Sequence, residues 1–362
     1  MITSVLLFFG GNMKIAFFDA KPYDKKYFDK ANSKYNYSIF YYDTHLSGDT
    51  VKLAEGSDVV CAFVNDKIDK FVIDKLVEYN VKLIVLRCAG YNNVDIKAAY
   101  NRIHIARVPA YSPNAVAEYA VALILSLSRR IPQSYNRVRD GNFLLNGLVG
   151  RNLNGRTAGI VGTGKIGKIT ALILKGMGMA VIAYDKYPDK NWSEANNIAY
   201  CTLEELYRRS DVISLHSPLT PETHHMINEG AISMMKKDVL IINTGRGALI
   251  ETRALINALK AGNIGGAGLD VYEEEDKLFF EDWSNTIIQD DVLARLLTFP
   301  NVILTGHQAF LTDEALSSIA STTLENIDQF LNQAKLENEI CYQCTENGPT
   351  VNCSRGKTGF CF

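Results

Sequence analysis

The sequence predicts an α/β protein that consists of two doubly wound domains, each built around a parallel sheet. Short apolar runs alternate with segments of helical periodicity over most of its 362 residues, as is typical of successive βαβ units. The length suits two domains, because a domain commonly contains about 100–200 residues. A glycine-rich turn also joins one of the expected strands to the helix that follows it.

The first series of elements leads to a long apolar helix. Its expected helix lies at 68–79, and its expected strands lie at 14–19, 37–42, 58–63, 83–87 and 103–108. The segment from Pro113 to about Arg130 has apolar residues on most faces of a helix, so we expect it to be buried between two bodies. A domain boundary is therefore expected at this point.

The second series repeats the alternation from residue 157 onward. Its expected strands lie at 157–161, 180–185, 211–216, 239–243, 266–272 and 301–305. Helices are expected between them at 165–177, 203–209, 252–261 and 291–297. A last helix, at 313–331, follows the final strand and could pack back on the first domain.

The composition argues against several classes of protein. Lys and Arg number 38 against 40 Asp and Glu, so the charge balance does not favour a nucleic-acid binder. No apolar stretch reaches the ~20 residues of a membrane helix. The apolar residues 1–12 lack the basic region and the small-residue cleavage site of a signal peptide. We therefore expect a cytoplasmic protein with neither a nucleic acid nor a membrane as partner.

The seven cysteines fall into two groups. Three of them, Cys61, Cys88 and Cys201, lie far apart in apolar surroundings, which is typical of buried thiols in a reducing compartment. The other four lie in the last 22 residues, at Cys341, Cys344, Cys353 and Cys361. These four could bind zinc as thiolates, but the second Cys-x-x-Cys pair of common zinc sites is missing. A disordered tail with incidental thiols, and no metal site, is the expectation.

A dinucleotide-binding fingerprint lies in the run TAGIVGTGKIG, where Gly162, Gly164 and Gly167 have G-x-G-x-x-G spacing between a strand and a helix. Such glycines permit a tight turn, close approach of a pyrophosphate and close packing of helix on strand, as in a Rossmann domain. Asp185 ends the next expected strand, where a carboxylate can bind both ribose hydroxyls of NAD and repel the 2′-phosphate of NADP. The sequence therefore predicts NAD as cofactor.

Candidate catalytic side chains follow other strands of the second series. Arg246 lies between two glycines in NTGRG after the strand at 239–243, where a guanidinium can bind a small carboxylate. His307 follows the strand at 301–305, and an imidazole there can exchange the proton that accompanies hydride transfer. His216 ends another strand and competes for this role. The residues leave the choice between the two histidines open.

An acidic run at 273–276 follows the strand at 266–272. One of its carboxylates could bind the catalytic imidazole, hold its tautomer and favour its protonated form. Spacing alone does not choose among the three glutamates of this run.

The runs GTGKIG, NTGRGALI, GLDVYEEEDKLFFED and LTGHQAF, in this order, resemble those of the D-isomer-specific 2-hydroxyacid dehydrogenases. Within that family the chain is most similar to the NAD-dependent D-lactate dehydrogenases. The resemblance extends from about residue 13 to about residue 338 and includes RCAGYNNVD and RVPAYSPNAVAEYA. It implies reversible hydride transfer between NADH and pyruvate, giving D-lactate, in a cleft between two domains. The tail after residue 338 resembles nothing in the family.

The resemblance also implies roles for individual residues. It makes Arg246, Glu275 and His307 the catalytic residues, with Arg246 also binding the substrate. Substrate contacts are further implied for Ala89, Gly90, Tyr111 and Phe310. Cofactor contacts are implied for Gly162, Gly164, Lys165, Ile166, Gly167, Asp185, Ser217, Pro218, Thr223, Thr244, Gly245 and Asp270.

The same resemblance divides the chain into domains. Residues 13–111 and 312–338 are expected to form the substrate-binding domain, residues 112–311 the NAD-binding domain, and residues 339–362 a tail of unknown role. A homodimer or homotetramer is implied. Two other functions stay open: a dehydrogenase for a bulkier 2-oxo acid, and an NAD-binding corepressor that mainly binds proteins. A purely structural nucleotide-binding protein fits the joint presence of Arg246, Glu275 and His307 poorly.

Overall fold

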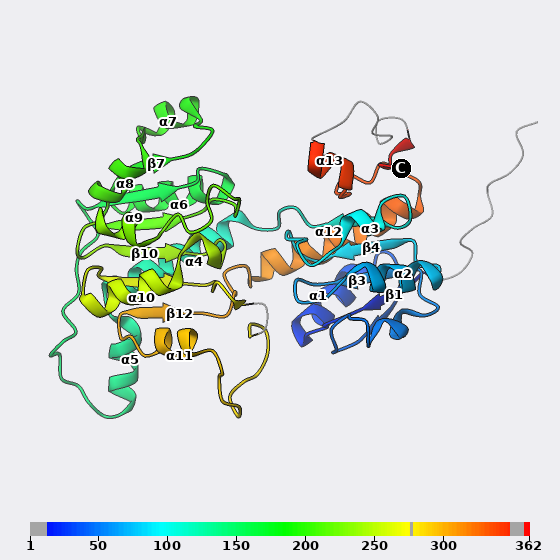
Figure 1. Ribbon diagram of the computed structural model, residues 1–362, viewed down its shortest axis with the longest axis horizontal. Helices are drawn as coiled ribbons and strands as arrows, with labels where there is room; N and C mark the ends of the chain where they lie inside the picture. The colour runs from blue at the N-terminus through cyan, green and yellow to red at the C-terminus, as the bar shows by residue number, and fades with distance from the viewer. Residues whose placement is uncertain (1–12, 276–277, 348–357) are drawn as a thin grey trace, which may run out of the picture. The chain divides into compact units, whose positions relative to one another are not determined.

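The computed structural model describes residues 13–275, 278–347 and 358–362 (Figure 1). Asp276 of the acidic run and Cys353 of the tail lie outside the described residues. The chain divides into two compact units, here called unit 1 (Met1–Ser112 with Thr312–Phe362) and unit 2 (Pro113–Leu311). Among the residues that the structure places, no helix is long and apolar enough to cross a membrane.

Unit 1 contains, in its described part, a five-stranded sheet whose strands are all parallel. In the order β2-β1-β3-β4-β5 they are Ser38–Tyr41, Lys14–Phe17, Val59–Ala62, Leu83–Leu86 and His104–Arg107. Every residue of β3 and β4 is buried, as expected for central strands of a sheet covered on both faces. The helical segments are α1 (Pro22–Asn32), η1 (Val51–Ala54), α2 (Lys70–Glu78), α3 (Ile96–Ala99), α12 (Asp313–Leu331) and α13 (Tyr342–Asn347).

The C-terminal part of the chain completes unit 1. Helix α12 packs against α1, β4 and β5 and buries an apolar stripe that includes Ile319, Leu324 and Ile327. Residues 338–340 then lie along the outer edge of β5, where Arg107 N–H donates to Asn338 O (3.1 Å) and Ile340 N–H donates to Ile105 O (2.8 Å). The expectation of a disordered tail is therefore wrong for its described residues, because backbone pairing and buried side chains hold them to the sheet.

A buried arginine follows β4 in unit 1. The Arg87 side chain is 2% exposed and lies 4.8 Å and 4.4 Å from the ring centres of Phe17 and Phe63. Its Nη2 donates to Asp19 O (2.5 Å) and lies 3.4 Å from a carboxylate oxygen of Asp24. Burial alone would lower the pKa of Arg87, but the surrounding carboxylates raise it above its usual range, so the guanidinium stays charged.

Unit 2 contains, over the residues described, a seven-stranded parallel sheet in the order β12-β11-β10-β9-β6-β7-β8. In chain order β6 to β12 are Thr157–Val161, Ala180–Tyr184, Ala199–Tyr200, Val212–Leu215, Leu240–Asn243, Gly266–Leu269 and Val302–Leu304. Strands β7 and β8 are added on one side of β6, and β9 to β12 are then added on its other side. This reversal of strand order creates the topological switch point where doubly wound sheets bind ligands. The predicted fold class is confirmed, since both sheets are parallel and covered by helices.

Helices cover both faces of the unit 2 sheet. The long helix α4 (Pro113–Ser128) packs with α6 (Lys165–Gly176) on one core, which includes Ile124, Leu174 and Ile242. A second core includes Leu206, Ile213 and Leu255. The other helical segments are α5 (Ile131–Arg139), α7 (Lys190–Asn196), α8 (Leu203–Arg209), α9 (Glu229–Ser233), η2 (Gly247–Leu249), α10 (Thr252–Ala261) and α11 (Asp291–Leu297).

Candidate active site

The glycine loop of unit 2 connects β6 to α6 at the switch point. Gly162 has φ +91°, and a Cβ there would meet the backbone of His216 and Ser217 at 2.7 Å. Gly167 packs directly against the carbonyl oxygen of Gly162, so neither position has room for a side chain. Gly164 is the N-cap of α6 and has no side chain that could cap the first turn, and Lys165 is the first residue of the helix. The first-turn N–H groups of α6, next to Ile166, can therefore bind a phosphate.

Asp185 is fixed beside this loop at the end of β7. Its Oδ2 accepts hydrogen bonds from the Thr163 N–H (2.6 Å) and the Thr163 hydroxyl (2.9 Å), and its Oδ1 accepts from the Tyr187 N–H (2.8 Å). The Thr163 hydroxyl also lies 2.7 Å from Tyr200 Oη. Sequence reasoning missed Thr163, although its place between the first two glycines of the fingerprint was a usable signal. A carboxylate held in this way retains acceptor capacity for a ribose hydroxyl.

The segment after β9 is tied together by Thr223. Its hydroxyl donates to Pro218 O (2.7 Å) and accepts from the Thr220 N–H (2.8 Å), which closes a turn next to Ser217. His216, the competing catalytic candidate, lies 2.9 Å from the Ser214 hydroxyl through Nε2. Burial lowers the pKa of His216 to about 4, so this imidazole is neutral near pH 7 and poorly suited to donate a proton.

Arg246 projects from a turn that Asn243 holds at the end of β10. The Asn243 side chain accepts from the Gly245 N–H (3.0 Å) and donates to Arg246 O (2.8 Å). The half-buried Arg246 guanidinium donates from Nη1 to Gly245 O (2.7 Å). Thr244 is 8% exposed, and among the described residues its hydroxyl has no hydrogen-bond partner. A cofactor bound along the sheet edge could supply the hydrogen bond that this buried hydroxyl lacks.

His307 and Glu275 are brought together from two loops. His307 Nδ1 lies 3.0 Å from Glu275 Oε1, while Glu275 Oε2 accepts the Tyr272 N–H (2.9 Å). His307 has φ +53°, a left-handed conformation, and its N–H donates to Asp270 O (2.8 Å). The Phe280 ring centre lies 5.9 Å from that of the imidazole. The backbone and the carboxylate together therefore fix where the imidazole lies.

The buried Asp270 carboxylate supports the histidine loop. It accepts from the Thr305 hydroxyl (2.6 Å), the Gln308 N–H (2.9 Å) and the Ala309 N–H (2.8 Å). Burial raises the pKa of Asp270, and these hydrogen bonds oppose that rise. Gln308 in turn donates to Tyr119 Oη (2.8 Å). The family resemblance implies a cofactor contact for Asp270, and the structure adds its support of the loop that carries His307.

The structure distinguishes the glutamates that spacing could not. Glu273 pairs with a different histidine, since His225 Nε2 lies 2.5 Å from its Oε1, and its other oxygen accepts from Thr252. Burial alone would raise the pKa of Glu273, but the hydrogen bonds from Thr252 and His225 lower it. Glu274 is exposed. Glu275 is therefore the glutamate that contacts His307.

The remaining predicted substrate contacts follow strands of unit 1 or, in the case of Phe310, follow His307 in the sequence. Ala89 and Gly90 follow β4, where Ala89 O accepts from Arg107 Nη1 (2.6 Å) and Gly90 O accepts from the Cys88 thiol (3.3 Å). Tyr111 is half-buried in the segment after β5. Phe310 belongs to unit 2, where it is 8% exposed.

These features define a class of protein. Residues 121–309 match the D-isomer specific 2-hydroxyacid dehydrogenase, NAD binding domain. The match covers the glycine loop, Asp185, Arg246, Glu275 and His307. The chain belongs to this family, and the predictions of the family, of an oxidoreductase and of NAD as its cofactor are confirmed.

Individual members of the family are similar over nearly their whole length. The chain is 51% identical over 329 residues to a 2-hydroxyacid dehydrogenase homologue of Haemophilus influenzae, covering 91% of this chain and 99% of that protein. It is 49% identical over 329 residues to the D-lactate dehydrogenase of Escherichia coli, covering 91% and 100%. A solved structure of the pyruvate reductase of Chlamydomonas reinhardtii matches it with a TM-score of 0.87 at 43% identity, covering 90% and 98%.

Proposed function

We propose that this chain is an NAD-dependent D-lactate dehydrogenase that interconverts pyruvate and D-lactate. The observation that carries the proposal is the His307–Glu275 pair (3.0 Å), which follows the same sheet as the glycine loop and Arg246. Parallel sheets bind ligands beyond the carboxyl ends of their strands, so these groups lie where a substrate is expected. The names of the Escherichia coli and Chlamydomonas relatives support pyruvate and D-lactate as the substrate pair.

The residues of the chain divide the chemistry among them. NADH, when bound, supplies the hydride. The Arg246 guanidinium binds the substrate carboxylate and polarises the adjacent carbonyl. With Nδ1 on Glu275, His307 donates a proton from Nε2 to the carbonyl oxygen, and takes that proton back when lactate is oxidised. Glu275 is a positioning residue, because it holds the imidazole through the nitrogen that does not meet the substrate.

We assign the cofactor contacts along the unit 2 sheet edge. The loop formed by Gly162, Gly164 and Gly167 admits the pyrophosphate, Lys165 and Ile166 line the dinucleotide, and Asp185 binds the adenosine ribose. The rest of the dinucleotide lies along Ser217, Pro218, Thr223, Thr244, Gly245 and Asp270. The Thr244 hydroxyl, which has no partner among the described residues, supports this assignment, because a bound cofactor would be able to supply one.

We assign further substrate contacts and a domain division to the chain. The backbone N–H groups of Ala89 and Gly90 bind the substrate carboxylate, and Tyr111 and Phe310 limit the space for its side chain. Residues 13–111 and 312–338 form the substrate-binding domain, and residues 112–311 form the NAD-binding domain. We further propose a cytoplasmic homodimer or homotetramer, which light scattering of the purified chain would measure.

The experiment follows NADH oxidation by the purified chain with pyruvate and with a series of larger 2-oxo acids, and determines the chirality of the product. Turnover of pyruvate to D-lactate supports the proposal. Turnover of larger oxo acids alone keeps the mechanism but contradicts the substrate. Tight NADH binding without turnover of any oxo acid contradicts the enzyme and favours the corepressor.

The two directions of the reaction should depend on pH in opposite senses. Reduction needs protonated His307, which donates the one proton that the reaction consumes, so its kcat/KM falls as pH rises. Oxidation needs the neutral imidazole, so its kcat/KM falls as pH decreases. Initial rates in both directions over pH 5 to 10 measure this dependence. Profiles that run parallel would exclude His307 as the proton donor and acceptor.

A further inference from the structure

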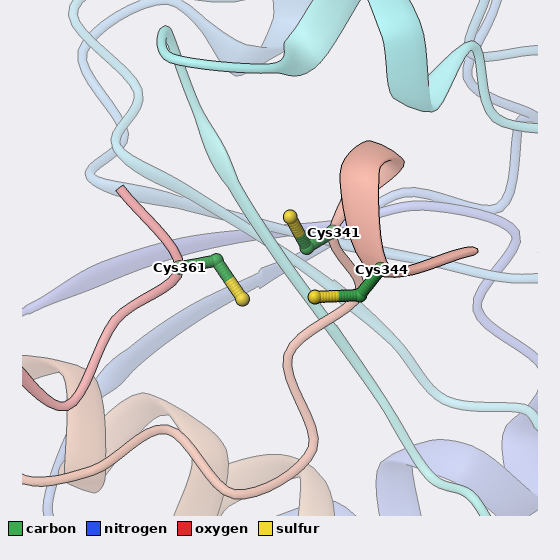
Figure 2. A group of neighbouring side chains, drawn as sticks. All are labelled: Cys341, Cys344 and Cys361. Carbon is green, nitrogen blue, oxygen red and sulfur yellow. The ribbon is translucent and has the colours of Figure 1, made fainter. Parts of the chain in front are cut away.

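Three cysteines that are distant in sequence meet in unit 1 (Figure 2). Cys341 immediately precedes α13, Cys344 lies in its first turn, and Cys361 belongs to the segment 358–362. Their three Sγ atoms all lie within 4.8 Å of one another. Cys341 is 5% exposed and Cys361 is 4% exposed, while Cys344 is half-buried. In Figure 2 the thiols of Cys344 and Cys361 point toward one another.

Backbone geometry brings the first two thiols together. Residues 338–340 pair with the edge of β5, and α13 begins immediately afterward. The Thr345 N–H donates to Cys341 O (3.0 Å), which closes a helical turn over this Cys-x-x-Cys. Side chains three residues apart lie on the same face of a helix, so Cys341 and Cys344 can contact the same ligand.

Contacts that involve no thiol place the third cysteine. The Cys361 N–H donates to Glu339 Oε2 (2.7 Å), and the other carboxylate oxygen of Glu339 lies 2.7 Å from His104 Nδ1. The Phe362 ring stacks on the His104 ring with centres 4.4 Å apart and planes at 5°. The Leu336 N–H also donates to Gly359 O (3.0 Å). The chain end is therefore held in place by a buried carboxylate, an aromatic stack and the backbone.

The cluster has the size and chemistry of a thiolate metal site. Zinc–sulfur bonds of ~2.3 Å in tetrahedral geometry place sulfur atoms about 3.8 Å apart, a spacing that the observed limit of 4.8 Å accommodates. Thiolates are soft ligands that favour zinc over magnesium or calcium. The contacts of the buried Glu339 with His104 and Cys361, and the stacking of Phe362 on His104, also supply the support around the ligands that precise metal sites require.

We propose that Cys341, Cys344 and Cys361 bind one zinc ion as three thiolates. Binding releases the thiol protons to solvent and leaves one tetrahedral position for another ligand. The sequence lacks the second Cys-x-x-Cys of common zinc sites, but here the third thiolate comes from Cys361, which the contacts of Glu339 and Phe362 hold beside α13. The ion would bind the end of the chain to α13 and so secure the segment that covers the edge of β5. This role is independent of the proposed catalytic residues, which belong to other segments.

The experiment measures metal binding by the full chain, purified under reducing conditions. Reduced, metal-free wild-type protein is titrated with Zn²⁺ in competition with a chromophoric chelator, and with Co²⁺ as a spectroscopic probe. We expect one ion per chain, a thiolate-to-cobalt charge-transfer band in the near ultraviolet, and visible bands of tetrahedral cobalt. The thermal unfolding midpoint should also rise when Zn²⁺ is added.

Single Cys→Ser variants test the three ligands. Cys344→Ser is the mildest, because Cys344 is half-buried, and it should weaken the charge-transfer band by about one third and lower zinc affinity at least tenfold. Cys341→Ser and Cys361→Ser should do the same. Cys201→Ser, at a half-buried thiol of unit 2, is the matched control and should bind both ions as the wild type does.

Two results would overturn the proposal. One is a reduced wild-type chain that takes up neither ion in stoichiometric amounts, a result that does not depend on whether any variant folds. The other is cobalt binding in which Cys344→Ser has the spectrum of the wild type, or in which Cys201→Ser loses as much of the band as Cys344→Ser. Circular dichroism of each variant shows whether it is folded before its metal binding is scored.

Discussion

Arg87 in unit 1 and Arg246 in unit 2 each follow a fully buried strand of a parallel sheet, yet their surroundings differ sharply. Arg87 is 2% exposed, lies between Phe17 and Phe63, and faces the carboxylates of Asp19 and Asp24. Arg246 is half-buried and donates to the carbonyl of its neighbour Gly245. The charge of Arg87 is balanced inside the protein, whereas the charge of Arg246 can be balanced by a bound carboxylate.

The histidines of unit 2 differ in the same way. His216 is held by Ser214 at the end of β9, and burial keeps it neutral near pH 7. His307 is held by Glu275, whose Oε1 lies 3.0 Å from Nδ1 and leaves Nε2 for a substrate. Residue type and position after a strand are thus shared by structural and functional side chains. The partner of each side chain distinguishes them, and sequence spacing does not reveal that partner.

The comparison would be tested most strongly by His307→Gln. Loss of the general acid should lower kcat for pyruvate reduction by about 10²–10⁴-fold. The matched control is His225→Gln, because His225 forms the second His–Glu pair, with Glu273, and should keep most of the activity. Steady-state kinetics of both variants measure the difference. Equal losses would mean that the two pairs cannot be told apart by function.

Arg87→Met should have the largest effect on stability. It removes the guanidinium that faces the buried carboxylates of Asp19 and Asp24, which costs about 3–5 kcal/mol. Asp19 keeps its ion pair with Lys21 (2.7 Å). Arg246→Met should change stability by less than about 0.5 kcal/mol, while raising KM for pyruvate and lowering kcat. Amide hydrogen exchange resolves the two units, and only Arg87→Met should reduce protection in β1 and β4. A loss of stability in Arg246→Met as large as in Arg87→Met would contradict the contrast.

The low pKa of His216 predicts acid sensitivity. Below pH 6.5 the unfolded chain binds a proton on this imidazole, while the folded chain does not until about pH 4. The free energy of unfolding should therefore decrease by up to about 3 kcal/mol as pH falls through this range. Urea unfolding of wild type and His216→Asn at pH 7 and pH 5 isolates the effect, because the variant lacks the titrating group. Identical pH dependence in both chains would show that His216 is not desolvated.

The smallest expected effect concerns Asp185. Asp185→Ala removes a charge-assisted contact with the ribose, worth about 1.5–3 kcal/mol, and removes the repulsion of a 2′-phosphate. The preference for NADH over NADPH in kcat/KM should therefore decrease by about tenfold or more. Kinetics with both cofactors measure the ratio. An unchanged ratio would assign Asp185 only the role seen in the structure, that of holding Thr163.

Much of the fold could be predicted, because local patterns determine it. The helix at Asp313–Leu331 has the expected bounds, since its apolar stripe is long and Thr312 caps its first turn by accepting the Ala315 N–H (3.2 Å). The two-residue strand Ala199–Tyr200 was missed, because so short a segment carries no periodicity. The pairing of His307 with Glu275 depends on how two loops, one after β11 and one after β12, lie relative to each other in space. Spacing alone could not select it.

Unit 1 is assembled from two stretches of chain, and unit 2 lies between them in the sequence. When residues up to Leu311 have emerged from the ribosome, all of unit 2 is available to fold. Unit 1 still lacks α12 and the segment that pairs with β5. The surfaces of α1, β4 and β5 that α12 covers stay open during this interval. The unit whose first strands are synthesised earliest is therefore the unit that can finish folding last.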